Sequence, residues 1–197
     1  MLALAIMLAV VLAACGTQDE PAPNETDGEA GEVTTGGDLV IAIPSSPVSL
    51  DPHGSNDSPS SNVSTNIYDS LLWQDGNGEL HPALATEWEL VEDTVWELQL
   101  REGVKFHDDS DFNAEVVKAN FDRVLDPEVA SPRSFLFDMV TEVTVVDEFT
   151  VQFTTEFPFA PLPSHLAHTG GGIISLPSIE ADYAAMAEGK DPGSVIS

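Results

Sequence analysis

Basic residues are scarce in this sequence. Six lysines and arginines stand against 34 aspartates and glutamates, and none of the six precedes Arg101. Binding to nucleic-acid phosphates needs cationic side chains, so this balance argues against nucleic acid as a partner. The acids continue beyond the N-terminal segments, which predicts a solvated acidic surface suited to saline or alkaline surroundings, although such surfaces also occur without that adaptation.

Cysteine is almost absent as well, and the single one, Cys15, follows an apolar run at residues 1–14. That run is too short to span a bilayer and has the length of a signal-peptide core, although the usual basic segment is missing and translation could begin upstream of Met1. The sequence Leu12-Ala13-Ala14-Cys15 resembles a lipobox. Residues 1–15 are therefore predicted to be a lipoprotein signal peptide with Cys15 lipidated; the alternative is an ordinary signal peptide that contains a cysteine.

Large apolar side chains are missing from residues 16–37 except at Val33, and this stretch carries six acids and no base. Such a segment cannot bury enough surface to offset its chain entropy. It is predicted to be a disordered tether between the lipid anchor and a domain outside the membrane. No second long apolar run follows, so the chain is expected to be anchored to the membrane and not to span it.

From Asp38 onward, short strands and helices are predicted to alternate. Their apolar side chains recur at period two in the strands and at helical spacing in the helices. The predicted strands are 39–43, 87–91, 95–101, 104–106, 143–146 and 149–153. The predicted helices are one capped by Ser61 or Asn62 with Val63, Ile67 and Leu71 on its face, one over 114–125 capped by Asn113, and one over 178–189.

Residues 107–111 place His107 beside Asp108, Asp109 and Asp111, which could form a metal site, an acid–base site or the polar entrance to a helix. The other histidines show no ligand spacing with this group, and the central glycine of a calcium loop is absent. Acids just before a helix N-terminus are favoured for electrostatic reasons, so the third interpretation is preferred. Gly170–Gly172 lacks the Lys-Ser or Lys-Thr of a phosphate loop, and no serine has a Gly-x-Ser-x-Gly context. The sequence therefore predicts no enzyme, no metal and no cofactor.

Several motifs together resemble the family 5 extracellular solute-binding proteins of ABC importers, which take up oligopeptides, dipeptides, glutathione, nickel complexes and haem. They are LDP (50–52), IYDSLL (67–72), PALATEW (82–88), WELQLREGVKFHD (96–108) and FNAEVV (112–117). Asp109 stands where the family often has glycine, so the loop there is expected to take a different turn.

The resemblance implies a mixed α/β fold, the two-lobe class II fold of periplasmic binding proteins. It assigns 38–68 to the start of domain I, 69–186 to domain II and 187–197 to a return toward domain I. Family members are more than twice as long, so the chain is expected to lack the lobe that closes over the ligand. Residues 37–197 alone are then expected to bind no solute with useful affinity.

The resemblance also implies a ligand site. The loop that follows Leu-Asp-Pro, here with Asn56, Asp57 and Ser58, is expected to pair with a peptide backbone as an added strand. Arg133 is a second candidate, either clamping a ligand carboxylate or merely solvated. The implied protein is a monomeric lipoprotein on the outer face of the cell membrane, or in the periplasm where an outer membrane exists. It would deliver peptides or a solute such as glutathione to a permease with its ATPase.

Three alternatives stay open at this point. A receptor for a nickel complex or haem would belong to the same family. A metal-dependent extracellular hydrolase would use His107 and the neighbouring acids. A surface adhesion module would bind no small ligand.

Overall fold

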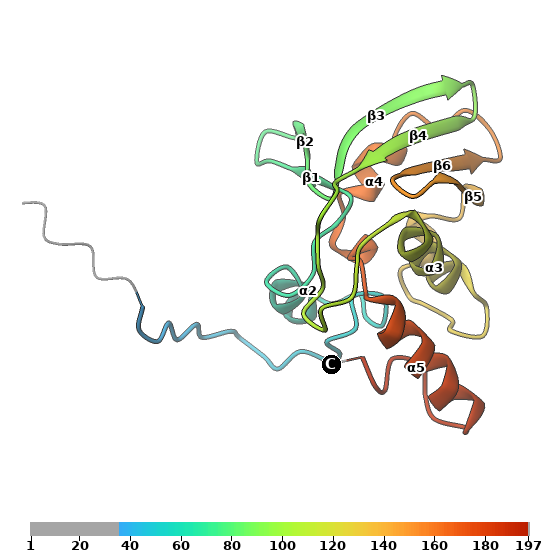
Figure 1. Ribbon diagram of the computed structural model, residues 1–197. Helices are drawn as coiled ribbons and strands as arrows, with labels where there is room; N and C mark the ends of the chain where they lie inside the picture. Colours follow the sequence, from blue (N-terminus) through green and yellow to red (C-terminus); the bar gives the residue numbers. More distant parts are fainter. Residues whose placement is uncertain (1–35, 197) are drawn as a thin grey trace, which may run out of the picture. The chain divides into compact units, whose positions relative to one another are not determined.

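In the computed structural model, which describes residues 36–196, an antiparallel sheet has the strand order β3-β4-β6-β5 (Figure 1). Two hairpins supply its strands: β3 (Ala85–Glu92) with β4 (Val95–Leu100), and β5 (Val140–Asp147) with β6 (Thr150–Thr155). The central strands β4 and β6 pair with each other, with Leu98 opposite Val151. Both hairpins were predicted from alternating apolar residues around polar turns, and both are confirmed.

One face of this sheet is apolar and the other polar. Leu98, Val151 and Phe153 are buried on the first face, while Gln152 on the second donates to a carboxylate oxygen of Glu97 at 2.7 Å. Helix α3 (Ala114–Leu125) packs against β5 and β6 on the apolar face (Figure 1). The sheet and α3 therefore enclose the main hydrophobic core.

Helix α3 forms as the sequence predicts. The side chain of Asn113 accepts a hydrogen bond from the Val116 N–H at 3.1 Å and so caps the first turn. The predicted apolar face is buried along its whole length, at Ala114, Val117, Phe121 and Val124. The ring of Phe121 meets Phe153 edge to face, with centroids 4.8 Å apart, which fixes the helix on the sheet.

The remaining elements surround this layer. They are α2 (Ser58–Ser64), the hairpin of β1 (Leu72–Gln74) and β2 (Leu80–Pro82), α4 (Leu162–Leu166), α5 (Leu176–Ala187) and the 3₁₀ turns η2 (Ser134–Leu136) and η3 (Thr169–Gly171). The predicted turn at 75–78 joins β1 to β2, and the C-terminal helix begins two residues earlier than predicted.

Three predicted elements differ from the structure. The segment Leu39–Ile43 is not a strand, and Leu39 and Val40 are 84% and 88% exposed. A strand needs a hydrogen-bonded neighbour, and among the described residues none pairs with this segment. The short strand predicted at 104–106 is reduced to a single bridge between Lys105 and Asp111.

The first predicted helix is also shorter than expected. It ends at Ser64, so Ile67 and Leu71 lie beyond it. Its cap is Asp57, whose carboxylate accepts from the Ser60 N–H at 2.9 Å. Asp57 precedes the predicted caps because Pro59 suits the first turn of a helix, where a missing N–H costs nothing.

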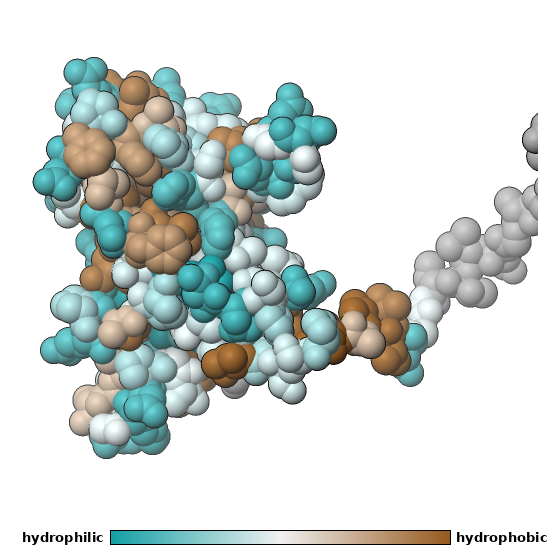
Figure 2. Space-filling model, turned by 180° about the vertical axis from the view of Figure 1, so that it is seen from behind, coloured by the Kyte–Doolittle hydropathy of each residue, from teal (hydrophilic) through white to brown (hydrophobic). Residues whose placement is uncertain are grey.

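Among the described residues, 36–41 belong to a different compact unit from 42–196. The domain boundaries at 68/69 and 186/187 stay predictions. In the described part of the chain, no helix is long and apolar enough to cross a membrane. The face seen in Figure 2 is mostly polar, with apolar side chains in separate spots.

Asp109 adopts a φ of 65°, the left-handed region that favours glycine, so the aspartate takes up a conformation that glycine adopts without strain. We expect Asp109→Gly to raise the free energy of unfolding by about 0.5–1 kcal/mol. Asp109→Ala, which keeps a Cβ but loses the carboxylate, is the matched control and should not stabilise the protein. Urea unfolding of the three proteins measures this; equal stability of the Gly and Ala variants would contradict it.

Candidate functional site

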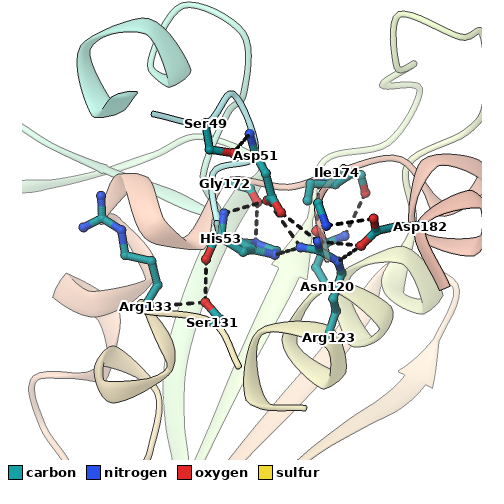
Figure 3. Close-up of polar contacts among 11 residues, drawn as sticks. Ser49, Asp51, His53, Asn120, Arg123, Ser131, Arg133, Gly172, Ile174 and Asp182 are labelled. Carbon is teal, nitrogen blue, oxygen red and sulfur yellow. Dashed lines mark hydrogen bonds and ion pairs between the residues drawn. The ribbon is translucent and has the colours of Figure 1, made fainter. Parts of the chain in front are cut away.

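Arg123, on α3, is the centre of a buried polar network (Figure 3). Its Nη2 donates to Oδ2 of Asp51 at 2.7 Å and to Oδ2 of Asp182, on α5, at 2.8 Å. All three side chains are at most 2% exposed. Burial opposes the charge of Arg123, but the hydrogen bonds and charges of the two aspartates outweigh it and raise the pKa of Arg123. The network therefore contains a charged guanidinium.

His53 completes this network as a neutral side chain. Its Nδ1 lies 3.0 Å from Nη1 of Arg123, and its Nε2 lies 3.0 Å from the carbonyl oxygen of Gly172. A guanidinium can only donate and a carbonyl can only accept, so Nδ1 accepts and Nε2–H donates. Burial lowers the pKa of His53 to about 4, against the opposing effect of Asp51, which agrees with this tautomer.

The turn that begins at Asp51 is held by the same carboxylate. Oδ1 of Asp51 accepts from the His53 N–H at 2.8 Å, and the Asp51 carbonyl accepts from the Gly54 N–H at 3.0 Å. From the other side, the Ser131 hydroxyl donates to the His53 carbonyl at 2.6 Å. The first half of the loop Asp51–Ser58 is thus fixed through both side chain and main chain.

Arg133 holds the second half of this loop. Its Nε donates to the Ser55 carbonyl at 2.6 Å, Nη1 to Oδ1 of Asn56 at 2.7 Å and Nη2 to the Ser61 hydroxyl at 2.8 Å. The side chain is nearly buried, so the interpretation of Arg133 as a solvated arginine is wrong. Burial lowers the pKa of Arg133, and the charge of Asp57 opposes that effect.

The four predicted ligand residues therefore lie together, although Arg133 is 77 residues from Asn56 in the sequence. Asn56 and Ser58 are exposed and face solvent. The carboxylate of Asp57 caps α2 by accepting a hydrogen bond from the Ser60 N–H, and this bond lowers the pKa of Asp57. Cys15, the predicted lipidation site, lies outside the described residues.

The glycines at 170–172 let three segments approach one another closely. A Cβ on Gly170 would lie 2.9 Å from the side chain of Arg133, and one on Gly172 would lie 3.1 Å from Pro52 and from Tyr68. The run is thus explained by packing against the loop and Arg133.

Asp108, next to His107, links this loop to Ser175 at the start of α5. The Asp108 carboxylate accepts from the Ser175 hydroxyl at 2.7 Å and from the Ser110 N–H at 3.0 Å, while His107 is exposed. Within residues 36–196, Asp75, Glu79 and His81 are the group whose ligand atoms could surround a metal ion, all within 4.8 Å of one another on the β1–β2 hairpin.

Sequence reasoning missed Arg123, His53 and Asp182 and noted Asp51 only as part of a motif. A signal was present in α3, because Asn120 and Arg123 follow Val116 and Val117 at helical spacing and share the buried side of the helix. A basic residue at such a position, in a chain with few bases, predicts a buried acidic partner.

Comparison with known proteins identifies the group to which this arrangement belongs. The model of the bacterial extracellular solute-binding proteins, family 5, matches residues 79–194. The glutathione-binding protein GsiB of Pectobacterium atrosepticum is 39% identical over 139 residues, which cover 70% of this chain and 27% of that protein. GsiB of Escherichia coli K12 is 35% identical over 144 residues, or 73% of this chain and 28% of that protein.

Solved structures agree on the fold. The murein tripeptide-binding protein MppA of Escherichia coli matches 71% of this chain and 31% of its own with a TM-score of 0.66 and 23% identity. The Helicobacter pylori protein DppA, solved with the peptide STSA, matches 74% of this chain and 32% of its own with a TM-score of 0.63 and 28% identity.

The chain belongs to the family 5 extracellular solute-binding proteins. Its fold is mixed α/β and corresponds to part of the class II periplasmic-binding-protein fold. It spans just over a quarter of the length of the curated relatives that it matches.

Proposed function

We propose that this chain is part of the solute receptor of an ABC importer and captures oligopeptides, or a small peptide such as glutathione, without chemical conversion. One observation carries the proposal: Arg133 donates to Ser55 and Asn56 of the loop and to Ser61 of α2, and so ties the loop to this helix while Asn56 and Ser58 stay exposed. An ordered, exposed loop can bind a ligand without a large loss of its own conformational entropy.

The main chain of this loop suits an extended peptide. Within the described residues, neither the N–H nor the C=O of Asn56 makes a hydrogen bond to the protein backbone. Both groups can pair with a peptide laid alongside as an added strand, which recognises main chain and tolerates different side chains. Arg133 uses three of its five N–H groups on Ser55, Asn56 and Ser61, so its main role in the proposed site is to hold the loop and α2 together.

The similar proteins support a peptide-like solute. Two of them are named for glutathione, a tripeptide, and a third was solved with a four-residue peptide. A nickel-type receptor is the second candidate, because Brucella suis NikA, solved with Fe(III)-EDTA, is 28% identical with a TM-score of 0.62. The proposed partners are a permease with its ATPase, and the receptor is proposed to be a monomer.

Calorimetric titration tests the function. The complete gene product, purified without its anchor, is titrated with glutathione, with a pool of tri- to pentapeptides and with Ni²⁺-EDTA. We expect binding of glutathione or peptides in the micromolar range or tighter. Binding of the metal complex alone would favour the second candidate, and binding of none would contradict the proposal.

A matched pair of variants tests main-chain recognition. Asn56→Pro removes the backbone N–H and is expected to weaken binding about tenfold or more, whereas Asn56→Ala keeps it and should change affinity only a few-fold. Thermal unfolding of each variant shows whether the loop change disturbs the fold. Equal loss of affinity in both would contradict main-chain pairing at this residue.

The localisation is proposed to be the outer face of the membrane, with Cys15 as the lipid anchor. We expect Cys15→Ser to move the protein from the membrane pellet into the soluble fraction, because a lipid chain supplies the apolar area that holds it there. Fractionation with immunoblotting measures this, with Thr17→Ser in the adjacent tether as control. A Cys15→Ser protein that stays in the pellet would contradict the anchor.

A further inference from the structure

The residues around Arg123 come from three separate parts of the chain. Asp51 and His53 open the loop Asp51–Ser58, Asp182 lies on α5, and Gly193 donates its N–H to Oδ1 of Asp182 at 2.8 Å. A Cβ on Gly193 would lie only 2.5 Å from Oδ2 of Asp51, so this segment packs directly onto the network.

We propose that Arg123 is a positioning residue for the proposed solute site, holding the loop Asp51–Ser58 in the one conformation that meets the ligand. The inference rests on the proposed function, because Arg123 is buried and would affect ligand binding only through the loop that it holds.

Arg123 contacts two residues in the first turn of the loop. Its Nη1 and Nη2 reach the two carboxylate oxygens of Asp51, at 3.3 and 2.7 Å, and Nη1 also reaches His53 at 3.0 Å. The planar guanidinium fork fixes the direction of the carboxylate as well as its distance, which a lysine ammonium cannot do. Asp51 in turn orients the main chain at His53 and Gly54.

The loop is therefore held at both ends by arginines. Arg123 fixes its beginning through Asp51 and His53, and Arg133 fixes Ser55 and Asn56. Between them the chain has little freedom, so Asn56 and Ser58 are presented to solvent in one arrangement. If the beginning were loosened, only a fraction of molecules would present the binding conformation, and the apparent dissociation constant would rise in inverse proportion to that fraction.

The stability of the fold alone does not explain why a charged network surrounds Arg123. Well-packed apolar side chains of similar volume are often as stable as a buried ion pair or more so, whereas only the charged fork imposes a direction on its partners. A guanidinium between two carboxylates, with a neutral histidine beside it, is an arrangement that specifies geometry.

Hydrogen exchange tests the positioning role without any ligand. In the complete gene product, Arg123→Lys keeps the charge and loses the fork. We expect the amides of His53 and Gly54 to exchange about tenfold faster or more, with much smaller changes in β4 and β6. Val143→Ala, a core change in β5 that removes none of the network's hydrogen bonds, is the control and should affect the sheet and not the loop. Unchanged loop amides, or equal acceleration everywhere, would overturn the proposal.

Titration with glutathione and with the tri- to pentapeptide pool, at a temperature where all variants are folded, is the second arm. Arg123→Lys is expected to bind about tenfold more weakly, and Val143→Ala as tightly as the wild type. Equal affinity of Arg123→Lys and wild type would overturn the role in binding. If the wild type binds neither probe, the proposed function fails, while the exchange experiment still decides whether Arg123 positions the loop.

Discussion

Replacing Arg123 by methionine is expected to lower the free energy of unfolding by about 3–5 kcal/mol, because it leaves buried charges without a partner. The carboxylates of Asp51 and Asp182 are at most 2% exposed, and both lose their hydrogen bonds to the guanidinium. Neither carboxylate can recover them from water without opening the packing between α3, α5 and the loop. Urea unfolding of wild type and variant, with the slope compared as well as the midpoint, measures the loss.

Lys118→Met provides the matched control on the same helix. Lys118 forms an ion pair with Asp122 at 2.9 Å, but the two side chains are 39% and 55% exposed to solvent. Exposed pairs of this spacing contribute about 0.3–0.5 kcal/mol, so the control should stay close to the wild type. A loss at Arg123→Met no larger than the loss at Lys118→Met would show that the buried network does not stabilise the fold.

Acidification from pH 7 toward pH 4 is expected to remove about 3 kcal/mol of stability through His53 alone. In the folded protein its pKa is lowered to about 4 from an ordinary value of 6.5. Between these two pH values His53 is protonated in the unfolded chain but neutral in the folded protein, so the free energy of unfolding decreases as the pH falls. Each pH unit in this window costs about 1.4 kcal/mol, and the effect levels off below the folded-state pKa.

His53→Gln isolates this effect, because glutamine stays neutral across the whole window. The charged groups that act on His53 are Asp51 and Arg123, and both remain in the variant. Burial also lowers the pKa of His168, whose contribution is common to both proteins and cancels in the comparison. Urea unfolding at pH 7, 6 and 5 should give a shallower decline for the variant; parallel declines would contradict a neutral, buried His53.

Helix α3 and the two hairpins of the sheet were predictable because local sequence determines them. In α3, the cap at Asn113 and the spacing of Val117, Phe121 and Val124 are enough to specify where the helix begins and which side it buries. The two hairpins follow in the same way from strand alternation around polar turns. The strand predicted at Leu39–Ile43 was wrong because a strand depends on a partner elsewhere in the chain.

The candidate site was likewise predictable from the sequence only in part. The resemblance carried by the sequence motifs pointed to Asn56, Asp57, Ser58 and Arg133, so the sequence by itself determined which loop to consider and which family to compare. It could not show that Arg133 is buried against that loop, or that Arg123 pairs with Asp51 and Asp182, which are 72 and 59 residues away. Those pairings follow from where α3, α5 and the loop meet once the core has packed. Burial of a charged side chain is strongly unfavourable unless an opposite charge lies within hydrogen-bonding distance. Whether such a partner is present depends on how distant segments pack, so only the tertiary structure decides it.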